Sequence, residues 1–258
     1  MYLKITGSSN NRLKISRNLR SRSYIMKHRA FLMEGSRFVA DYLRNSEPKW
    51  IILSEEATPA SRAVVNDVSE AGIDILEIPL KLFSEISDTA HSQGIIAICE
   101  LPWIKENELE PEGSFLLLDR ISDPGNIGTI IRSAAAFGCS SVIMGKGCCF
   151  PFLPKVTRAS AGANVKVPLL YDIDLPSLML RNSDNCTFIG AEASGGPMEQ
   201  IKASTGSIGI VIGSEAHGIS EKVHERLDGT VSIPMKKGVE SLNAAVSASI
   251  LLYAAGNH

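Results

Sequence analysis

The sequence predicts an α/β protein of two domains, and three observations support this. Short apolar runs that suit strands alternate with helix-like patterns along most of the chain. Residues 101–113, rich in Pro and Glu, interrupt this alternation and have the composition of a linker. Residues 115–118 are apolar throughout, as a strand covered on both faces requires. We therefore expect a smaller domain in residues 1–105 and a larger domain with a mostly parallel sheet in residues 106–258.

The first domain shows a short series of strand and helix patterns. Sparse apolar positions among basic residues predict a helix over residues 10–30. A short strand is predicted next over residues 31–35, which begins with three apolar residues and ends in Gly. The remaining predicted elements are helices at 36–44, 60–71 and 79–86, and strands at 50–53, 73–78 and 94–99. Such an alternation indicates a small α/β domain.

The second domain begins with the apolar strand at 115–118. A helix pattern follows at 127–137, with small residues at 133–136 that allow close packing. Further strands are predicted at 141–144, 165–169, 188–191, 209–212 and 231–233, and a long helix rich in Ala and Leu at 241–255. No internal repeat or low-complexity tract interrupts the pattern.

The charge of the chain is unevenly distributed. The net charge is −2, yet residues 1–37 hold nine of the 26 Lys and Arg residues and one of the 28 Asp and Glu residues. This segment therefore carries a charge of +8, while the rest of the chain carries −10. A basic block of this kind favours contact with phosphates, although charge alone fits a solvated helix face equally well.

Cysteine content and hydropathy limit the class of protein. The five cysteines are few for 258 residues, are odd in number and show no C-x-x-C spacing, which favours a reduced, intracellular protein. The adjacent Cys148 and Cys149 suit packing better than metal binding, so we expect no metal site. Neither a membrane-length apolar run nor a signal-peptide core is visible. We expect a cytoplasmic protein without membrane contact, with an organellar address in a eukaryote as the alternative.

Three segments of the second domain carry the functional signal. They are residues 119–128 with Arg132, residues 212–219, and residues 233–235 with 238–245. In each, an apolar strand ends in a loop rich in Gly, Pro or Asn, and a helix pattern soon follows. Loops at the carboxyl ends of strands are where open α/β sheets bind ligands. The amide, guanidinium, carboxylate and hydroxyl groups in these loops suit a polar substrate.

Each polar residue in these segments also has a structural interpretation. Asn126 and Ser241 are good helix caps, and Glu215 suits the first turn of a following helix. Arg132 alone would suit an ion pair on a partly exposed helix. His217 lies in the loop at 213–218 and is interpreted as structural rather than as a general base.

The three segments, in this order, resemble the motifs of the SpoU/TrmH family of RNA ribose 2'-O-methyltransferases. The resemblance spans residue 115 to the C-terminus and implies S-adenosylmethionine as cofactor, a trefoil knot of the SPOUT class, and a homodimer formed through the second domain. It implies catalytic roles for Asn126, Arg132, Glu215, Ser241 and Asn243. It places the cofactor against Ala191, Glu192, Gly213, Ile233 and Leu242, largely through backbone groups.

The first domain more weakly resembles the substrate-binding domain of such enzymes. The matching features are Ile5-Thr6 with the basic helix, residues 31–35, and residues 87–89 with 93–97. This resemblance favours RNA as the partner of the basic block, and ribosomal RNA over transfer RNA as the substrate. The expected RNA-binding residues are Arg12, Lys14, Arg17, Arg20, Arg22, Lys27, Arg29 and Arg158.

Other classes fit the sequence less well. The glycines at 213 and 218 have P-loop spacing, but Ile219 stands where that motif needs a lysine. No G-x-G-x-x-G follows the first strand of the second domain, and no nucleophile elbow G-x-S-x-G occurs. Two alternatives remain: a methyltransferase acting on a base nitrogen, and a ribosome-assembly factor that binds RNA without catalysis.

Overall fold

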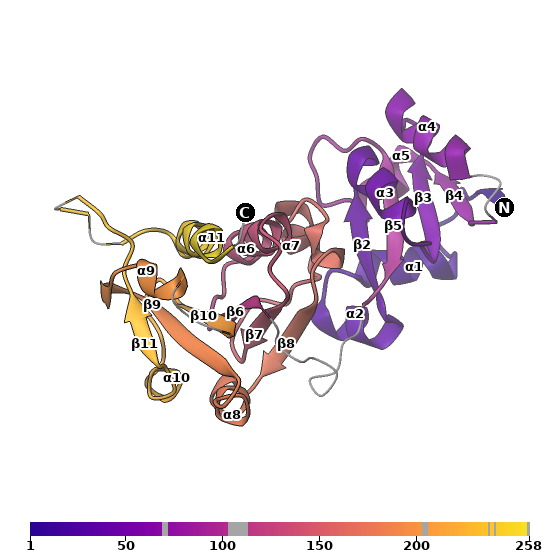
Figure 1. Cartoon of the computed structure of the whole chain (residues 1–258). Coiled ribbons are helices and arrows are strands. Elements are labelled where there is room, and N and C mark those ends of the chain that lie inside the picture. The colour runs from indigo at the N-terminus through magenta and orange to yellow at the C-terminus, as the bar shows by residue number, and fades with distance from the viewer. Residues whose placement is uncertain (69–71, 103–112, 203–205, 237, 240, 257–258) are drawn as a thin grey trace. The chain divides into compact units, whose positions relative to one another are not determined.

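The structure is a computed structural model that describes residues 1–68, 72–102, 113–202, 206–236, 238–239 and 241–256. The described chain divides into two compact units (Figure 1). The first holds Met1–Pro102 and also Phe152–Gly162, and the second holds the remaining described residues. Most of the predicted linker, residues 103–112, lies outside the described residues.

The first unit is built on a mixed sheet of five strands. The strands are β1 (Tyr2–Lys4), β2 (Ala30–Glu34), β3 (Trp50–Ser54), β4 (Ile75–Ile78) and β5 (Ile95–Glu100), in the spatial order β1-β4-β3-β5-β2. β4 is parallel to both β1 and β3, whereas β5 is antiparallel to β3 and β2. The small α/β fold expected for this part of the chain is confirmed.

In the described part of the N-terminal sequence, five α-helices accompany this sheet. They are α1 (Asn11–Asn18), α2 (Arg22–His28), α3 (Ser36–Leu43), α4 (Pro59–Val68) and α5 (Leu80–Ser84). The prediction of one continuous helix over residues 10–30 is wrong. α1 ends at Asn18 and α2 begins at Arg22. Leu19 and Ile25 are both completely buried, and on one continuous helix residues six apart would point in different directions.

A short segment from later in the chain completes the first unit. Helix α7 (Pro154–Ala159) packs on β2, and the Phe152 ring lies 5.0 Å from that of Phe31. Gly162 has a φ of +77°, and a Cβ there would lie 3.6 Å from the Met33 side chain. The first unit is therefore assembled from two separate stretches of sequence.

The second unit is built on a sheet of six strands, all of them parallel. The strands are β6 (Ser114–Asp119), β7 (Val142–Gly145), β8 (Leu169–Ile173), β9 (Cys186–Gly196), β10 (Ser207–Gly213) and β11 (Gly229–Val231). Their spatial order is β11-β9-β10-β6-β7-β8. The parallel sheet predicted from residues 115–118 is confirmed, and residues 115–118 are completely buried in it.

Helices cover both faces of the second sheet (Figure 1). α6 (Pro124–Ala136) and α11 (Ala244–Ala255) pack together on one face, and α8 (Leu175–Arg181) and α10 (Glu221–His224) lie on the other. The remaining elements are α9 (Glu199–Lys202) and a 3-10 turn at Ala163–Val165. Alternate side chains of β6 point to opposite faces of the sheet. Phe115 and Leu117 lie in the core beneath α8, where the rings of Phe115 and Phe188 are 6.1 Å apart.

Two element predictions in the second unit are wrong. The strand expected at 165–169 begins only at Leu169, because Pro168 lacks the N–H that a strand inside a sheet donates. The helix expected from residue 241 begins at Ala244, after a cap at Asn243.

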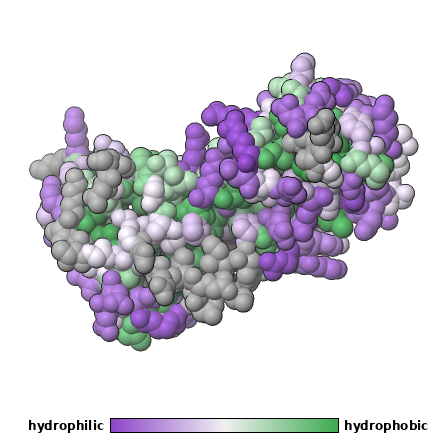
Figure 2. Space-filling model, turned by 45° about the vertical axis from the view of Figure 1, so that its right-hand side comes forward, coloured by the Kyte–Doolittle hydropathy of each residue, from purple (hydrophilic) through white to green (hydrophobic). Residues whose placement is uncertain are grey.

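The surface shows no sign of a membrane-spanning element in the described residues. No described helix is both long enough and apolar enough to cross a bilayer. In the view of Figure 2, apolar residues form separate patches among hydrophilic ones.

Candidate active site

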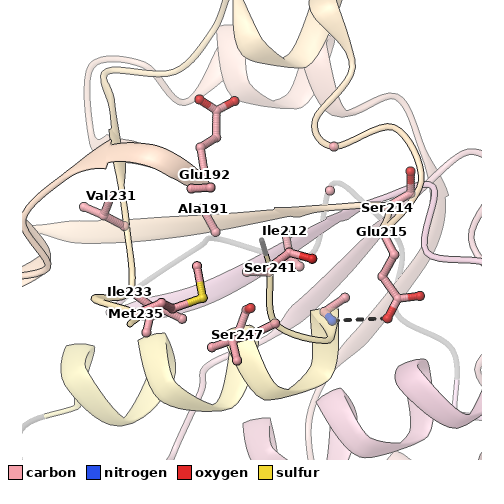
Figure 3. Close-up of a pocket in the computed structure, with 15 residues that line it drawn as sticks. Ala191, Glu192, Ile212, Ser214, Glu215, Val231, Ile233, Met235, Ser241 and Ser247 are labelled. Carbon is pink, nitrogen blue, oxygen red and sulfur yellow. Dashed lines mark hydrogen bonds between the residues drawn. The ribbon is translucent and has the colours of Figure 1, made fainter. Parts of the chain in front are cut away.

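A cavity of about 270 Å³ lies in the second unit at the carboxyl ends of β9, β10 and β11, beside the start of α11. The strand ends and the loops that follow them supply most of its wall (Figure 3). Its lining residues are Ala191, Glu192, Ala193, Ile212, Gly213, Ser214, Glu215, Gly218, Val231, Ile233, Met235, Ser241, Leu242, Ala244 and Ser247. A parallel sheet aligns all its carboxyl ends along one edge, which is why residues so distant in sequence meet here.

All five positions expected to hold a cofactor line this cavity. They are Ala191, Glu192, Gly213, Ile233 and Leu242. Two of the five expected catalytic residues, Glu215 and Ser241, line it as well. Sequence reasoning missed Ser214, Met235 and Ser247, among others. Ser214 directly follows Gly213 and Met235 lies two residues after Ile233, so their place in the motif segments at 212–219 and 233–235 was the signal available for them.

The cavity is bordered by a hydrogen-bonded group of three polar side chains, from Asn126, Glu215 and Asn243. The Oε1 atom of Glu215 accepts from Asn126 Nδ2 at 2.9 Å and from Asn243 Nδ2 at 2.8 Å. Asn243 Nδ2 also lies 2.9 Å from Asn126 Oδ1, to which it donates. The backbone N–H of Ala244 donates to Glu215 Oε1 at 3.4 Å, a contact drawn in Figure 3. Three predicted catalytic residues are thus in mutual contact.

Helix caps place two of these three residues. Asp123, not Asn126, caps α6, and its Oδ1 accepts from the N–H of Asn126 at 2.8 Å. Asn126 therefore sits in the first turn with its side chain turned to Glu215. Asn243, not Ser241, caps α11, and its Oδ1 accepts from the N–H of Ala245 at 2.9 Å. The capping roles considered for Asn126 and Ser241 are wrong, and Ser241 contributes to the cavity wall instead.

The loop that carries Glu215 is a tight turn. Ser214 and Gly218 exchange two backbone hydrogen bonds, of 3.1 and 2.8 Å, and the N–H of His217 donates to Ser214 Oγ at 3.2 Å. A Cβ at Gly213 would collide with the backbone of Gly218 and Ile219. Glycine at 213 is thus required by the return of the chain itself.

The walls of the cavity combine apolar and acidic groups. Ile212, Val231, Ile233, Met235 and Leu242 supply apolar surface. Glu192 extends from β9 away from Ile233 and Met235 in Figure 3, and its Oε1 lies 3.3 Å from His224 Nε2. Two carboxylates, those of Glu192 and Glu215, therefore border a mainly apolar space.

Arg132 is the one predicted catalytic residue that the structure leaves apart. It is exposed on α6 and is absent from the cavity lining and from the contacts of the Glu215 group among the described residues.

The predicted RNA-binding residues lie in the first unit, and several bind the protein itself. Arg12 Nη2 contacts Asp74 at 2.6 Å, and this hydrogen bond holds the pKa of the Asp74 carboxyl below its usual range. Arg17 pairs with Glu85 at 2.8 Å, and Arg20 donates to the carbonyls of residues 85, 86 and 87. Arg158 donates to the Asp88 carbonyl and to Thr89, both at 3.3 Å. Lys14, Arg22, Lys27 and Arg29 are exposed.

The cysteines do not form a reactive or metal-binding group. Burial raises the pKa of the Cys148 and Cys139 thiols to about 11, so both stay protonated near neutral pH. Within the described part of the chain, no group of three or more His, Cys, Asp or Glu side chains is placed to hold a metal ion. The interpretation of Cys148 as a packing residue agrees with its burial.

A cavity at the carboxyl edge of a parallel sheet, bordered by convergent amide and carboxylate groups, defines an α/β enzyme with a small-molecule site. The SpoU rRNA methylase family matches residues 113–253, and an MRM3-like substrate binding domain matches residues 10–97. The chain therefore belongs to the SpoU rRNA methylase family.

Individual relatives match over nearly the whole chain. The 23S rRNA (guanosine(2553)-2'-O)-methyltransferase RlmP of Bacillus subtilis is 30% identical, across 97% of this chain and 98% of its own. The human mitochondrial rRNA methyltransferase 3 is 27% identical, across 91% of this chain and 69% of its own. Among solved structures, a TrmH-family protein from Porphyromonas gingivalis is 30% identical with a TM-score of 0.81, covering 95% of this chain and 97% of its own.

One prediction concerns the double role of Asn243. Asn243→Ala removes the α11 cap and two side-chain hydrogen bonds, so the free energy of unfolding should fall by about 1–2 kcal/mol. Asn243→Asp keeps the cap but loses the donor and sets a carboxylate against Glu215. Urea denaturation should then show N243D as unstable as N243A or more so. Full stability in N243D would show that only the cap matters.

Proposed function

We propose that this protein transfers the methyl group of S-adenosylmethionine to a ribose 2'-hydroxyl of ribosomal RNA. The observation that carries the proposal is the cavity, which gathers all five expected cofactor positions beside the group formed by Asn126, Glu215 and Asn243. Family membership and the name of the Bacillus relative support the reaction and the substrate. The same family also makes the enzyme a methyltransferase rather than a passive RNA-binding factor.

The residues of the cavity fit this cofactor. Ile233, Met235 and Leu242 offer apolar surface to an adenine ring, and backbone groups at the strand ends can bond its polar edge. Glu192 and the hydroxyls of Ser214 and Ser247 can bond the ribose and the amino acid portion. When bound, S-adenosylmethionine supplies an electrophilic methyl group on a positively charged sulfur.

The chain's own residues would position and activate the RNA hydroxyl. Ser241, in the cavity wall, can hydrogen-bond the target hydroxyl. Arg132 is exposed, so it can grip an RNA phosphate and stabilise negative charge developing on the oxygen. A guanidinium keeps its proton in proteins, which excludes Arg132 as a simple general base. Glu215 holds Asn126 and Asn243 in place.

The test of this function is a methyl-transfer assay with labelled cofactor. Arg132→Ala should slow transfer to unmodified ribosomal RNA by about 100-fold or more, because it removes a group that acts on the reacting oxygen. Cofactor affinity, measured by calorimetry, should stay at the wild-type value because Arg132 lies outside the cavity lining. Leu242→Asp should instead abolish cofactor binding, because it puts a charge in the apolar wall of the cavity.

The products identify the reaction. Nuclease digestion and mass spectrometry should reveal a 2'-O-methylated nucleotide that is absent with R132A. A methylated base would favour the alternative of methylation at a base nitrogen. Label found in transfer RNA alone would show that transfer RNA, and not ribosomal RNA, is the substrate. Cofactor binding unaffected by L242D would contradict the assigned cavity.

We assign RNA binding to the first unit and catalysis to the second. The exposed Lys14 and Lys27 are the clearest candidates for phosphate contacts, since Arg12, Arg17 and Arg20 are bonded to protein atoms. Lys27 Nζ also lies 5.8 Å from the Tyr24 ring centre, so an aromatic face is close to the charge. An unpaired RNA strand suits such a surface because its bases can stack.

Lysine substitutions test this surface. Lys14→Ala and Lys27→Ala should each weaken RNA binding and reduce the slope of log affinity against log salt by about 1. Arg20→Ala is the contrasting variant: it removes hydrogen bonds to three carbonyls and should mainly lower the melting temperature. An unchanged salt slope in both lysine variants would contradict the assignment.

We further propose that the protein forms a homodimer through the face of α11. Val246 and Tyr253, seven residues apart on this helix, are 45% and 61% exposed, and Tyr253 packs edge-on against Phe137. A trefoil knot in the second unit and a cytoplasmic location complete the proposal, both resting on the family resemblance and the sequence.

A surface substitution tests the dimer. Tyr253→Glu should shift the sedimentation coefficient from dimer to monomer, because it buries a charge in an apolar contact. Leu180→Glu is the control, since Leu180 is 55% exposed on α8, across the sheet from α11. If both variants sediment as the wild type does, the dimer face is assigned wrongly.

A further inference from the structure

The loop that carries Glu215 is attached to the end of β6 at a second point. Asp119 is the last residue of β6 and lies opposite Gly213, the last residue of β10. From Gly213 the chain forms the 214–218 turn and comes back toward β6 at Ser220. There the Oδ2 atom of Asp119 accepts a hydrogen bond from the N–H of Ser220 at 2.6 Å.

The Asp119 carboxylate is buried, so it depends on its hydrogen bond to the loop. The residue is only 5% exposed, and buried carboxylates are costly unless they are paired or hydrogen-bonded. A bond from an amide to a carboxylate is about twice as strong as one between neutral groups. The short distance to Ser220 therefore marks a strong restraint on the end of the loop.

The neighbouring Arg120 adds a second contact of the same kind. Its Nη2 donates to the Gly218 carbonyl at 3.4 Å, and its Nε lies 3.5 Å from Asp119 Oδ1. Arg120 has a φ of +60°, a left-handed conformation that is unfavourable for a residue with a Cβ. Such strain persists only where surrounding contacts hold it, and here it turns the side chain toward the loop.

Residues 119–126 thus hold the Glu215 loop at two points. Asp119 fixes the loop at Ser220, and Asn126, seven residues after Asp119, bonds the Glu215 carboxylate itself. Three loop residues, Ser214, Glu215 and Gly218, line the cavity, so movement of the loop changes the site directly (Figure 3).

We infer that Asp119 is a positioning residue of this enzyme, which acts through the Ser220 amide to hold the 214–220 loop and Glu215 in the geometry of the site. The inference rests on the proposed function for its effect on methyl transfer. Its structural part, the restraint of the loop by Asp119, can be measured without the reaction.

A pair of substitutions at Ser220 tests the contact with Asp119. Ser220 has a φ of −67°, which the proline ring matches, so Ser220→Pro suits the backbone at this position. It removes the N–H and puts the ring Cδ where the hydrogen lay, which also pushes the Asp119 carboxylate aside, whereas Asp119→Ala loses the hydrogen bond without that displacement. Ser220→Ala keeps the N–H and loses only a hydroxyl that makes no capping bond to α10. The two variants therefore differ in the donor to Asp119.

The kinetic expectation follows from this contrast. S220P should lower kcat for methyl transfer by about 10- to 100-fold and weaken cofactor binding, as displacement of a positioned group does. S220A should match the wild type. Asp119→Ala should behave like S220P, and Asp119→Asn, which keeps an acceptor oxygen, should recover most of the lost rate. D119A and S220P together should be no worse than either alone, because both break one contact.

Two readouts do not depend on activity. Hydrogen exchange should be faster across residues 213–220 in D119A and S220P than in S220A, with the rest of the second unit unchanged. In protein labelled at serine, the Ser220 amide proton should resonate far downfield in the wild type. The signal is assigned by its absence in S220A, which has no serine at this position, and it should move upfield in D119A. Circular dichroism and melting temperature establish that each variant is folded, and if S220P is not, the comparison of D119A with D119N takes its place.

The outcomes separate the inference from the proposed function. Equal exchange and equal kinetics in S220P and S220A, or losses that multiply in the double variant, would overturn the role of Asp119. A wild-type protein that methylates no RNA, with exchange still accelerated in D119A, would overturn the proposed function and leave the restraint of the loop by Asp119 standing.

Discussion

One carboxylate oxygen, Oε1 of Glu215, joins three parts of the second unit that are far apart in sequence. It accepts bonds from the side chain of Asn126 on α6 and from the side chain and backbone at the start of α11. Glu215 and Asn243 are exposed, so solvent screening limits each bond to about 0.5–1 kcal/mol. Their convergence fixes the first turns of two helices against one loop, and the cavity beside them takes its shape from that junction.

This junction explains how a small number of polar residues serves both the fold and the site. Asn243 uses its oxygen to cap α11 and its nitrogen to bond Glu215 and Asn126. An aspartate or serine would cap the helix as well, but neither offers the amide donor. Asparagine is the residue type that meets both demands. The chemistry of the site is therefore built into the starts of α6 and α11 rather than added to them.

The sequence predicts strands better than it predicts caps and ion pairs. The run at 115–118 indicates a strand buried on both faces because every residue in it is apolar, and the structure agrees. The cap of α6 was misplaced because Asp123 and Asn126 are both good caps, and only the geometry of the turn selects Asp123.

The basic block was expected to face RNA throughout. Arg12 and Arg17 instead pair with Asp74 and Glu85, more than sixty residues away, and local patterns contain no information on such contacts. The cavity residues were found because family motifs, not periodicity, marked the strand ends.

The inclusion of Phe152–Gly162 in the first unit has a consequence for how that unit could be exchanged between proteins. The chain leaves the second unit, contributes α7 to the first, and returns, so the gene does not divide into two interchangeable halves. A fusion that moved only the N-terminal hundred residues to another catalytic scaffold would leave β2 without the helix that packs on it. An exchange of the complete first unit must therefore carry residues 152–162 together with the N-terminal hundred residues.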